Sequence, residues 1–153
     1  MSTPAFERHD HGQCIARGLS EAEARCAARG AQLTPVRRRT LEILLASHRA
    51  LGAYDVLARL SEEGLGSQPP VAYRALGFLT EHGLAHRIER LNAFVACSHP
   101  GERHDPAFLI CRGCGAVAEE EARDPVPDAA GFVIERTVVE ALGLCPACQE
   151  PGP

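Results

Sequence analysis

The spacing of apolar residues in the first half of the chain predicts short helices. Leu41, Leu44 and Leu45 recur at helical spacing, and Thr34 followed by Pro35 supplies an N-cap and a first-turn proline before them. We therefore predict a helix that begins at Pro35.

Three other segments have helical patterns. Residues 20–29 open with S-E-A-E, which has the form of a capping box, and a glycine follows them. Residues 54–60 predict a short helix that a glycine-containing turn stops. The segment PPVAYRALGFLTEHG at 69–83 starts with two prolines, repeats apolar residues at helical spacing and ends at a glycine. Together these segments predict a tri-helical core preceded by one further helix.

The pattern then changes to the alternation typical of strands. Residues 84–90 and 93–97 are two short segments of alternating hydropathy. Leu91 and Asn92 separate them, which fits a β-hairpin. Helices closed by such a hairpin are typical of a winged helix-turn-helix. The polar segment 98–106 contains proline and glycine and suits a hinge.

Beyond the hinge the pattern predicts a small sheet. Residues 107–111 and 115–120 indicate two strands that meet at the turn CRGCG, and residues 131–142 indicate a third. The segment RDPVPDAAG at 123–131 leaves room for at most a short helix because of its two prolines. We predict an α+β fold with an N-terminal winged helix-turn-helix domain and a small C-terminal α/β domain.

Composition and charge narrow the classes of protein that fit. No stretch approaches the ~20 apolar residues of a membrane span, and the polar N-terminus lacks the apolar core of a signal peptide. We therefore expect a cytoplasmic protein with no membrane partner. Residues 31–90 carry eight Arg against six acids, whereas residues 101–153 carry four Arg against ten acids. The middle of the chain is the part that could contact nucleic acid.

Two C-x-x-C turns carry the strongest chemical signal. They contribute Cys111, Cys114, Cys145 and Cys148, and tight turns can place four sulfurs ~2.3 Å from one tetrahedral zinc ion. A redox pair is the alternative, but such proteins carry one C-x-x-C that opens a helix, whereas both pairs here close strand-like segments. The odd total of seven cysteines disfavours a disulfide scaffold. We predict a closed, structural zinc site.

A second and looser set of candidate metal ligands offers sulfur, nitrogen and oxygen atoms. His86 and Cys97 lie on opposite arms of the predicted hairpin, His104 lies in the hinge, and Glu119 follows the first C-x-x-C. Such a set suits tetrahedral zinc. The spacing alone is a weak signal, because surface His and Glu are common and Cys97 also fits a core position.

Other histidines and cysteines have plainer interpretations. The tract HDHGQC, with His9, His11 and Cys14, is typical of a disordered tail, although it also fits a metal-binding role. We expect solvated side chains at His48, His82 and His99, and a packed side chain at Cys26.

The helix that starts near Val71 is the candidate reader of nucleic acid. The first turns of a recognition helix enter the major groove, where Arg can contact guanine through two hydrogen bonds. Arg74, with Tyr73 beside it, is placed to do so. The alternative is an arginine that is merely solvated.

These residues together resemble the ferric uptake regulator family of metal-sensing repressors. The matching segments cover most of 33–148 in order: LTPVR at 33–37, AYDVL at 53–57, PPVAYRAL at 69–76, HGLAHRIE at 82–89, FVAC at 94–97, CRGCGAVAEE at 111–120 and LCPAC at 144–148.

The resemblance is greatest to the zinc uptake regulator branch. Iron-sensing members carry Asp and His four and three residues before the first C-x-x-C, where this chain has Ala107 and Phe108. The zinc branch uses a histidine seven residues before it, and His104 stands there. The resemblance therefore implies a regulatory zinc set of His86, Cys97, His104 and Glu119.

The resemblance also implies the function. It suggests a zinc-responsive repressor, not an enzyme, that binds double-stranded operator DNA as a homodimer, takes no small-molecule substrate and controls zinc-uptake genes. Two Zn²⁺ would bind per chain, one structural and one regulatory. Tyr54 and Arg74 would contact bases, whereas Tyr73 and Arg37 would contact the DNA backbone. The implied parts are a flexible tail at 1–17, a DNA-binding domain at 18–98, a hinge at 99–104 and a zinc-stapled dimerisation domain at 105–153.

Some positions depart from the family pattern. PPVAYR replaces the usual PPTVYR, so a hydroxyl is missing at the start of the recognition helix, and the segment 122–131 is shorter than the usual interface helix. Apart from these departures, two alternatives stay open: a sensor of iron, nickel or peroxide with the same fold, and a thiol oxidoreductase.

Overall fold

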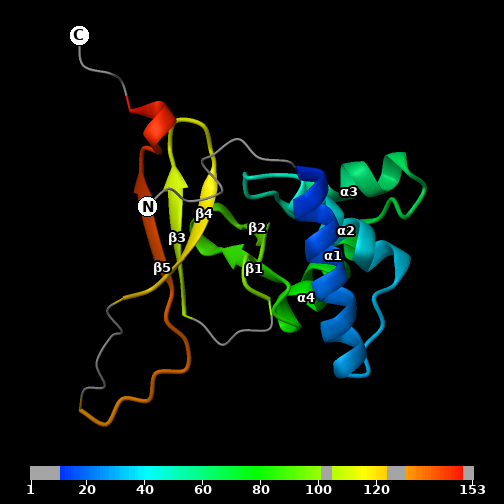
Figure 1. The fold of residues 1–153 in the computed structure, drawn as a ribbon, viewed down its shortest axis with the longest axis horizontal. Coiled ribbons are helices and arrows are strands. Elements are labelled where there is room, and N and C mark those ends of the chain that lie inside the picture. The colour runs from blue at the N-terminus through cyan, green and yellow to red at the C-terminus, as the bar shows by residue number, and fades with distance from the viewer. Residues whose placement is uncertain (1–10, 101–104, 124–129, 150–153) are drawn as a thin grey trace.

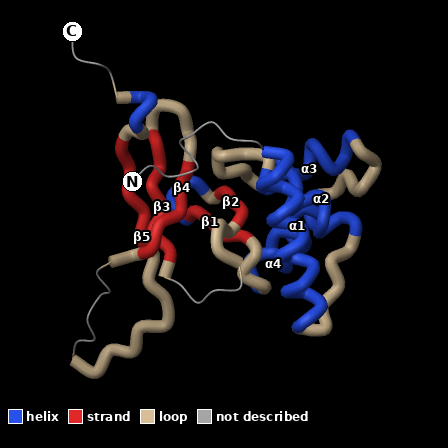
Figure 2. The backbone as a smooth tube through the Cα atoms, in the orientation of Figure 1, coloured by secondary structure: helices blue, strands red, loops and turns tan. Residues whose placement is uncertain are grey.

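The computed structural model describes residues 11–100, 105–123 and 130–149. Four helices lie on one side of the molecule, a three-stranded sheet lies on the other, and a two-stranded hairpin lies between them (Figure 1; Figure 2). The prediction of an α+β fold is confirmed. The elements are α1 (His11–Ala28), α2 (Pro35–Leu45), α3 (Ala53–Glu62), α4 (Pro69–Glu81), β1 (Ala85–Ile88), β2 (Ala93–Ala96), β3 (Pro106–Cys111), β4 (Val117–Glu121), β5 (Val139–Gly143) and the 3-10 turns η2 (Glu89–Leu91) and η3 (Pro146–Cys148).

The helical core forms from the segments in which apolar residues recur at helical spacing. Helix α2 begins at Pro35, and the Thr34 hydroxyl accepts a hydrogen bond from the backbone N–H of Arg37 at 3.4 Å. Side chains from α2, α3 and α4 bury themselves against one another. The largest fully buried ones among them are Ile43, Leu44, Leu60, Leu76 and Leu79. Burying each such side chain stabilises the fold by about 1.5–3 kcal/mol.

The predicted start of the first helix is wrong. Helix α1 begins at His11, nine residues before Ser20, so residues 11–17 of the predicted tail are helical. The reason is tertiary packing, because Ile15, Leu19, Ala22 and Cys26 form one face that lies on the helical core.

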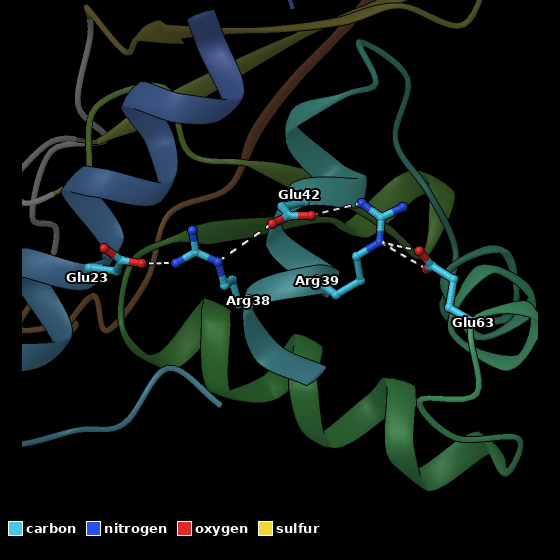
Figure 3. A network of polar contacts seen from close by, with 5 residues as sticks. All are labelled: Glu23, Arg38, Arg39, Glu42 and Glu63. Carbon is cyan, nitrogen blue, oxygen red and sulfur yellow. Dashed lines mark hydrogen bonds and ion pairs between the residues drawn. The ribbon is translucent and has the colours of Figure 1, made fainter. Parts of the chain in front are cut away.

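A network of charged side chains joins the first three helices on their outer surface (Figure 3). Arg38 contacts Glu23 of α1 and lies 3.7 Å from Glu42, and Arg39 contacts both Glu42 and Glu63 at 2.9 Å. Each exposed pair of this kind contributes at most about 1 kcal/mol. These two arginines are thus paired with carboxylates within the protein.

The predicted hairpin is confirmed. Strands β1 and β2 are antiparallel, with His86 opposite Val95, and Asn92 completes the turn in the left-handed conformation at φ 47°. Leu51 and Phe94 exchange two backbone hydrogen bonds, so the loop between α2 and α3 adds a third row to the hairpin.

The C-terminal sheet has the order β4-β3-β5. Strand β5 pairs parallel to β3 only from Val139, which lies opposite Ala107, so the predicted strand over 131–142 is mostly wrong. Residues upstream of Val139 would have to pair beyond Pro106, which has no N–H to donate. The short helix considered for 123–131 falls mostly on residues 124–129, which lie outside the described residues.

A small apolar core joins the hairpin to the C-terminal sheet. Ile88 and Val95 from the hairpin pack with Phe108, Ile110 and Val117 from the sheet. The two halves of the chain therefore share buried surface as well as polar contacts. None of the described helices is long and apolar enough to cross a bilayer.

Candidate metal centres and nucleic-acid surface

The four cysteines of the C-x-x-C turns converge on one point. Cys111 ends β3, Cys114 lies in the turn to β4, Cys145 follows β5, and Cys148 ends η3. Their sulfur atoms all lie within 4.8 Å of one another, and those of Cys114 and Cys145 are 3.8 Å apart. Pairing of β5 with β3 brings the two turns together although thirty residues separate them in sequence.

Two glycines make this convergence possible. Gly115 adopts φ +78°, which favours glycine, and its N–H donates to the carbonyl of Cys111 at 2.9 Å to close the turn. A Cβ on Gly113 would lie 3.1 Å from both Cβ and Sγ of Cys148. The loop thus approaches the second cysteine pair too closely for a larger residue without displacement.

The electrostatics of the four sulfurs favour a bound cation. Hydrogen bonds from the backbone N–H groups of Cys145 and Cys114 lower the pKa of Cys111 to about 6. Hydrogen bonding of Cys148 to Cys145 and to other neighbouring sulfurs raises its pKa to about 12. Four crowded sulfurs can all ionise only when a metal ion neutralises them. Four thiolates in this arrangement fit tetrahedral zinc and leave no open coordination position.

A second cluster lies where the hairpin meets the C-terminal sheet. It combines His86 of β1, Cys97 just after β2 and Glu119 of β4, whose ligand atoms lie within 4.8 Å of one another. His86 Nε2 is 3.1 Å from Glu119 Oε1, and Cys97 Sγ is 3.8 Å from the same oxygen. His104, the fourth residue of the sequence-based set, lies outside the described residues.

Ser98, which no sequence pattern singled out, orients the carboxylate of this cluster. Its backbone N–H and its hydroxyl donate to Glu119 Oε2 at 2.9 and 3.0 Å. The Glu119 side chain is only 4% exposed, so its second oxygen is held toward His86 and Cys97. The only sequence signal was the position of Ser98 directly after a candidate ligand.

The thiol of Cys97 is neutral when no cation is bound. Burial, followed by the charge of Glu119, raises its pKa to about 12. The half-buried imidazole of His86, the buried thiol of Cys97 and the carboxylate of Glu119 form a mixed donor set suited to zinc, and binding would release the thiol proton.

The candidate DNA-contacting residues lie exposed on α3 and α4. Tyr54 is 68% exposed at the start of α3, and Tyr73 is 51% exposed in the first turns of α4. Arg74 is also exposed beside Tyr73. The three side chains are therefore available to a ligand outside the protein.

Arg37 has contacts within the protein. Its guanidinium lies 3.8 Å above the ring of Phe78, and Nη1 donates to the carbonyl of Gln32 at 2.7 Å. The structure thus holds this side chain in place on α2, next to α4.

The remaining histidines and cysteines form no third cluster within the described residues. His9 and the side chain of His11 lie outside the described part, and Cys14 is half-buried on α1. Cys26 is buried, as predicted, whereas His82 is only half-exposed and stacks on Phe78 at 4.1 Å.

Comparison with known proteins gives a consistent result. No family model matches the chain. The zinc uptake regulation protein of Escherichia coli (strain K12) is 40% identical over 140 residues, which cover 86% of this chain and 81% of the relative. A solved zinc uptake regulator complexed with zinc and DNA has a TM-score of 0.79 and 36% identity over 88% of this chain and 94% of its own. The crystal structure of holo XcZur has a TM-score of 0.76 and 37% identity, and the match covers 85% of this chain and 95% of that structure's chain.

Proposed function

The chain belongs to the zinc uptake regulator branch of the ferric uptake regulator family, and on that premise we propose that it is a zinc-responsive transcriptional repressor. It binds operator DNA as a zinc-loaded dimer and controls zinc-uptake genes. The identity to the curated relative and the likeness to a regulator solved with zinc and DNA support this proposal.

The observation that carries the mechanism is the position of the second cluster. His86 and Cys97 belong to the winged half of the chain and Glu119 belongs to the C-terminal sheet, so the cluster joins the two halves. Bound zinc supplies coordinate bonds that cross-link these donors, with His104 as the proposed fourth ligand. The side chains then hold the hairpin against the sheet and set the direction in which α4 points.

The four-cysteine cluster has a structural role in this proposal. Cys111, Cys114, Cys145 and Cys148 hold a structural zinc that ties the end of β3 to the segment after β5. Because metal binding contributes directly to folding in such sites, this zinc stabilises the sheet and does not sense concentration.

The DNA-contacting residues follow from exposure and position. Arg74 and Tyr54 contact base edges in the major groove, and Tyr73 contacts the DNA backbone. Arg37 contributes a phosphate contact through the guanidinium N–H groups that Gln32 does not use.

We propose the domain organisation predicted from the sequence with one change, because α1 begins at His11 and Ile15 packs on the helical core. Residues 11–98 form the DNA-binding domain, 99–104 the hinge and 105–153 the dimerisation domain. Strand β5 lies at one edge of its sheet, and its exposed apolar residues, among them Leu142, support pairing with a second copy. Because the relative and the solved structures are named as regulators, we infer a cytoplasmic protein that is not an enzyme.

The test is zinc-dependent DNA binding. Wild-type protein loaded with zinc is used to select a duplex from a random-sequence pool, and fluorescence anisotropy then measures affinity with and without a chelator. We expect Cys97→Ser to lose the response to zinc while keeping the four-cysteine zinc and the dimer mass. Cys14→Ser, which changes a cysteine outside both clusters, should behave as wild type.

Two results would refute the proposal. If no duplex is enriched, or if Cys97→Ser keeps the wild-type zinc response, then this cluster does not sense zinc for DNA binding. Titration with competing iron and nickel, and with peroxide, tests whether a different signal is sensed. Turnover in an insulin-reduction assay would instead favour a thiol oxidoreductase.

A further inference from the structure

One row of side chains crosses the C-terminal sheet and faces the hairpin. In the strand register Phe108 of β3 lies opposite Glu119 of β4 on one side and opposite Glu140 of β5 on the other. Directly paired residues point to the same face of a sheet. Glu119 contacts His86, and the rings of Phe108 and His86 are 5.4 Å apart. The third member of the row is not explained by either metal cluster.

Glu140 binds the tip of the hairpin through two hydrogen bonds. Its Oε1 accepts a hydrogen bond from the backbone N–H of Glu89 at 2.6 Å, and its Oε2 accepts one from the N–H of Arg90 at 3.1 Å. These residues open η2, the turn between β1 and β2, and N–H groups at the start of a helical turn have no partner within it. The side chain of Glu89 also forms an ion pair with Arg136, which precedes β5.

On the sheet side this contact comes from a different strand than the zinc ligand Glu119, and it joins the same two halves of the chain. The hairpin of β1 and β2, residues 85–96, is the wing. Glu119 contacts the base of the wing from β4, whereas Glu140 contacts the tip of the wing from β5, the strand at the other edge of the sheet. Contacts at two separated points restrict rotation of the wing to the line that joins them, whereas either contact alone leaves rotation about that point. Zinc at one point and the carboxylate at the other therefore favour the same arrangement of the two halves.

We propose that Glu140 is a positioning residue for DNA binding: a clamp without metal that fixes the tip of the wing to the dimerisation sheet. The proposal rests on the proposed function above. Zinc binding and the clamp both stabilise the arrangement with the domains together, so each strengthens the other by linkage. Loss of the clamp weakens both regulatory zinc binding and operator binding, although Glu140 touches neither ligand.

The first test replaces Glu140 with Gln. Gln keeps the shape and one acceptor but turns an NH₂ group toward a backbone N–H. We expect about tenfold weaker regulatory zinc binding, measured by competition with a chromophoric chelator, and a similar loss of affinity for the selected duplex at saturating zinc. The dimer mass and the zinc content of the four-cysteine site should not change. Glu121→Gln removes an exposed carboxylate from the same sheet and should behave as wild type.

The second test removes the donor instead of the acceptor. Ile88 is extended at φ −88° and ψ 108°, which suits a residue before proline, and position 89 opens the turn, where proline is tolerated. Glu89→Pro therefore deletes one N–H, and Glu89→Ala is its control because it keeps that N–H and loses the same side chain. We expect Glu89→Pro to lose more zinc and DNA affinity than Glu89→Ala, and Glu140→Gln to add little to it.

The outcomes separate this inference from the proposed function. Wild-type zinc and DNA affinities in Glu140→Gln would overturn the clamp and leave the repressor proposal intact. Dissociation of Glu140→Gln into monomers, with no effect of Glu89→Pro relative to Glu89→Ala, would also overturn it, because Glu140 would then act at the dimer edge. If wild-type protein selects no duplex, the proposed function fails, and the zinc titration alone decides whether Glu140 clamps the wing.

Discussion

Replacement of Ser98 by Ala tests how the second cluster is oriented. The Ser98 hydroxyl lies 3.0 Å from Glu119 Oε2, and the backbone N–H of the same residue donates to that oxygen at 2.9 Å. Ser98 follows the hairpin and Glu119 belongs to the C-terminal sheet, so this bond exists only when the two halves lie together. Deleting it therefore destabilises the zinc-binding arrangement.

The magnitude follows from the kind of bond. A hydrogen bond to a charged acceptor contributes about 1.5–3 kcal/mol, and the value at Ser98 should lie at the lower end because this residue is exposed and water replaces part of the contact. A loss of about 1.4 kcal/mol corresponds to tenfold weaker regulatory zinc binding. Groups that orient metal ligands typically have effects of about 10–100-fold.

The assay is competition for zinc between a chromophoric chelator and protein whose four-cysteine site is already filled. Ser98→Thr is the matched control because it keeps the hydroxyl, and Ser61→Ala removes an exposed hydroxyl from α3. We expect tenfold weaker binding in Ser98→Ala alone. Equal zinc affinities for Ser98→Ala and Ser98→Thr would refute the idea that this hydroxyl orients Glu119.

Three further predictions concern other parts of the molecule. Gly113→Ala should lower the free energy of unfolding by about 1–3 kcal/mol, because the new Cβ would contact Cys148. Gly143→Ala is the control, since its Cβ would meet no atom within 4 Å, and equal melting temperatures for the two variants would contradict the prediction. Because the pKa of Cys97 is raised to about 12, its thiol must lose a proton when zinc binds, and the apparent affinity of the regulatory site for zinc should rise with pH across the neutral range. Chelator competition at several pH values measures this, and an affinity that does not change with pH would argue against Cys97 as a ligand. Arg74→Ala should weaken operator binding by about 1–3 kcal/mol in anisotropy titrations without changing zinc affinity, and an unchanged operator affinity would remove Arg74 from the interface.

The elements that could be predicted from the sequence are those with local causes. Thr34 and Pro35 start α2, and Asn92 turns the hairpin in the left-handed conformation, because capping and turn geometry depend on neighbours in the chain. The four-cysteine set could be found for the same reason, since each C-x-x-C pair brings its two sulfurs together within one turn.

The sequence by itself determined the helical core, the hairpin and the residue types able to bind zinc, since these depend on short-range periodicity and spacing. Only the tertiary structure decided that α1 extends back to His11, because Ile15 packs on the core, and that β5 is short, because β3 begins at a proline. It also decided the contacts of Ser98 with Glu119 and of Glu140 with the hairpin tip. These contacts join groups 21 to 51 residues apart, and no local pattern records which distant strands will lie face to face.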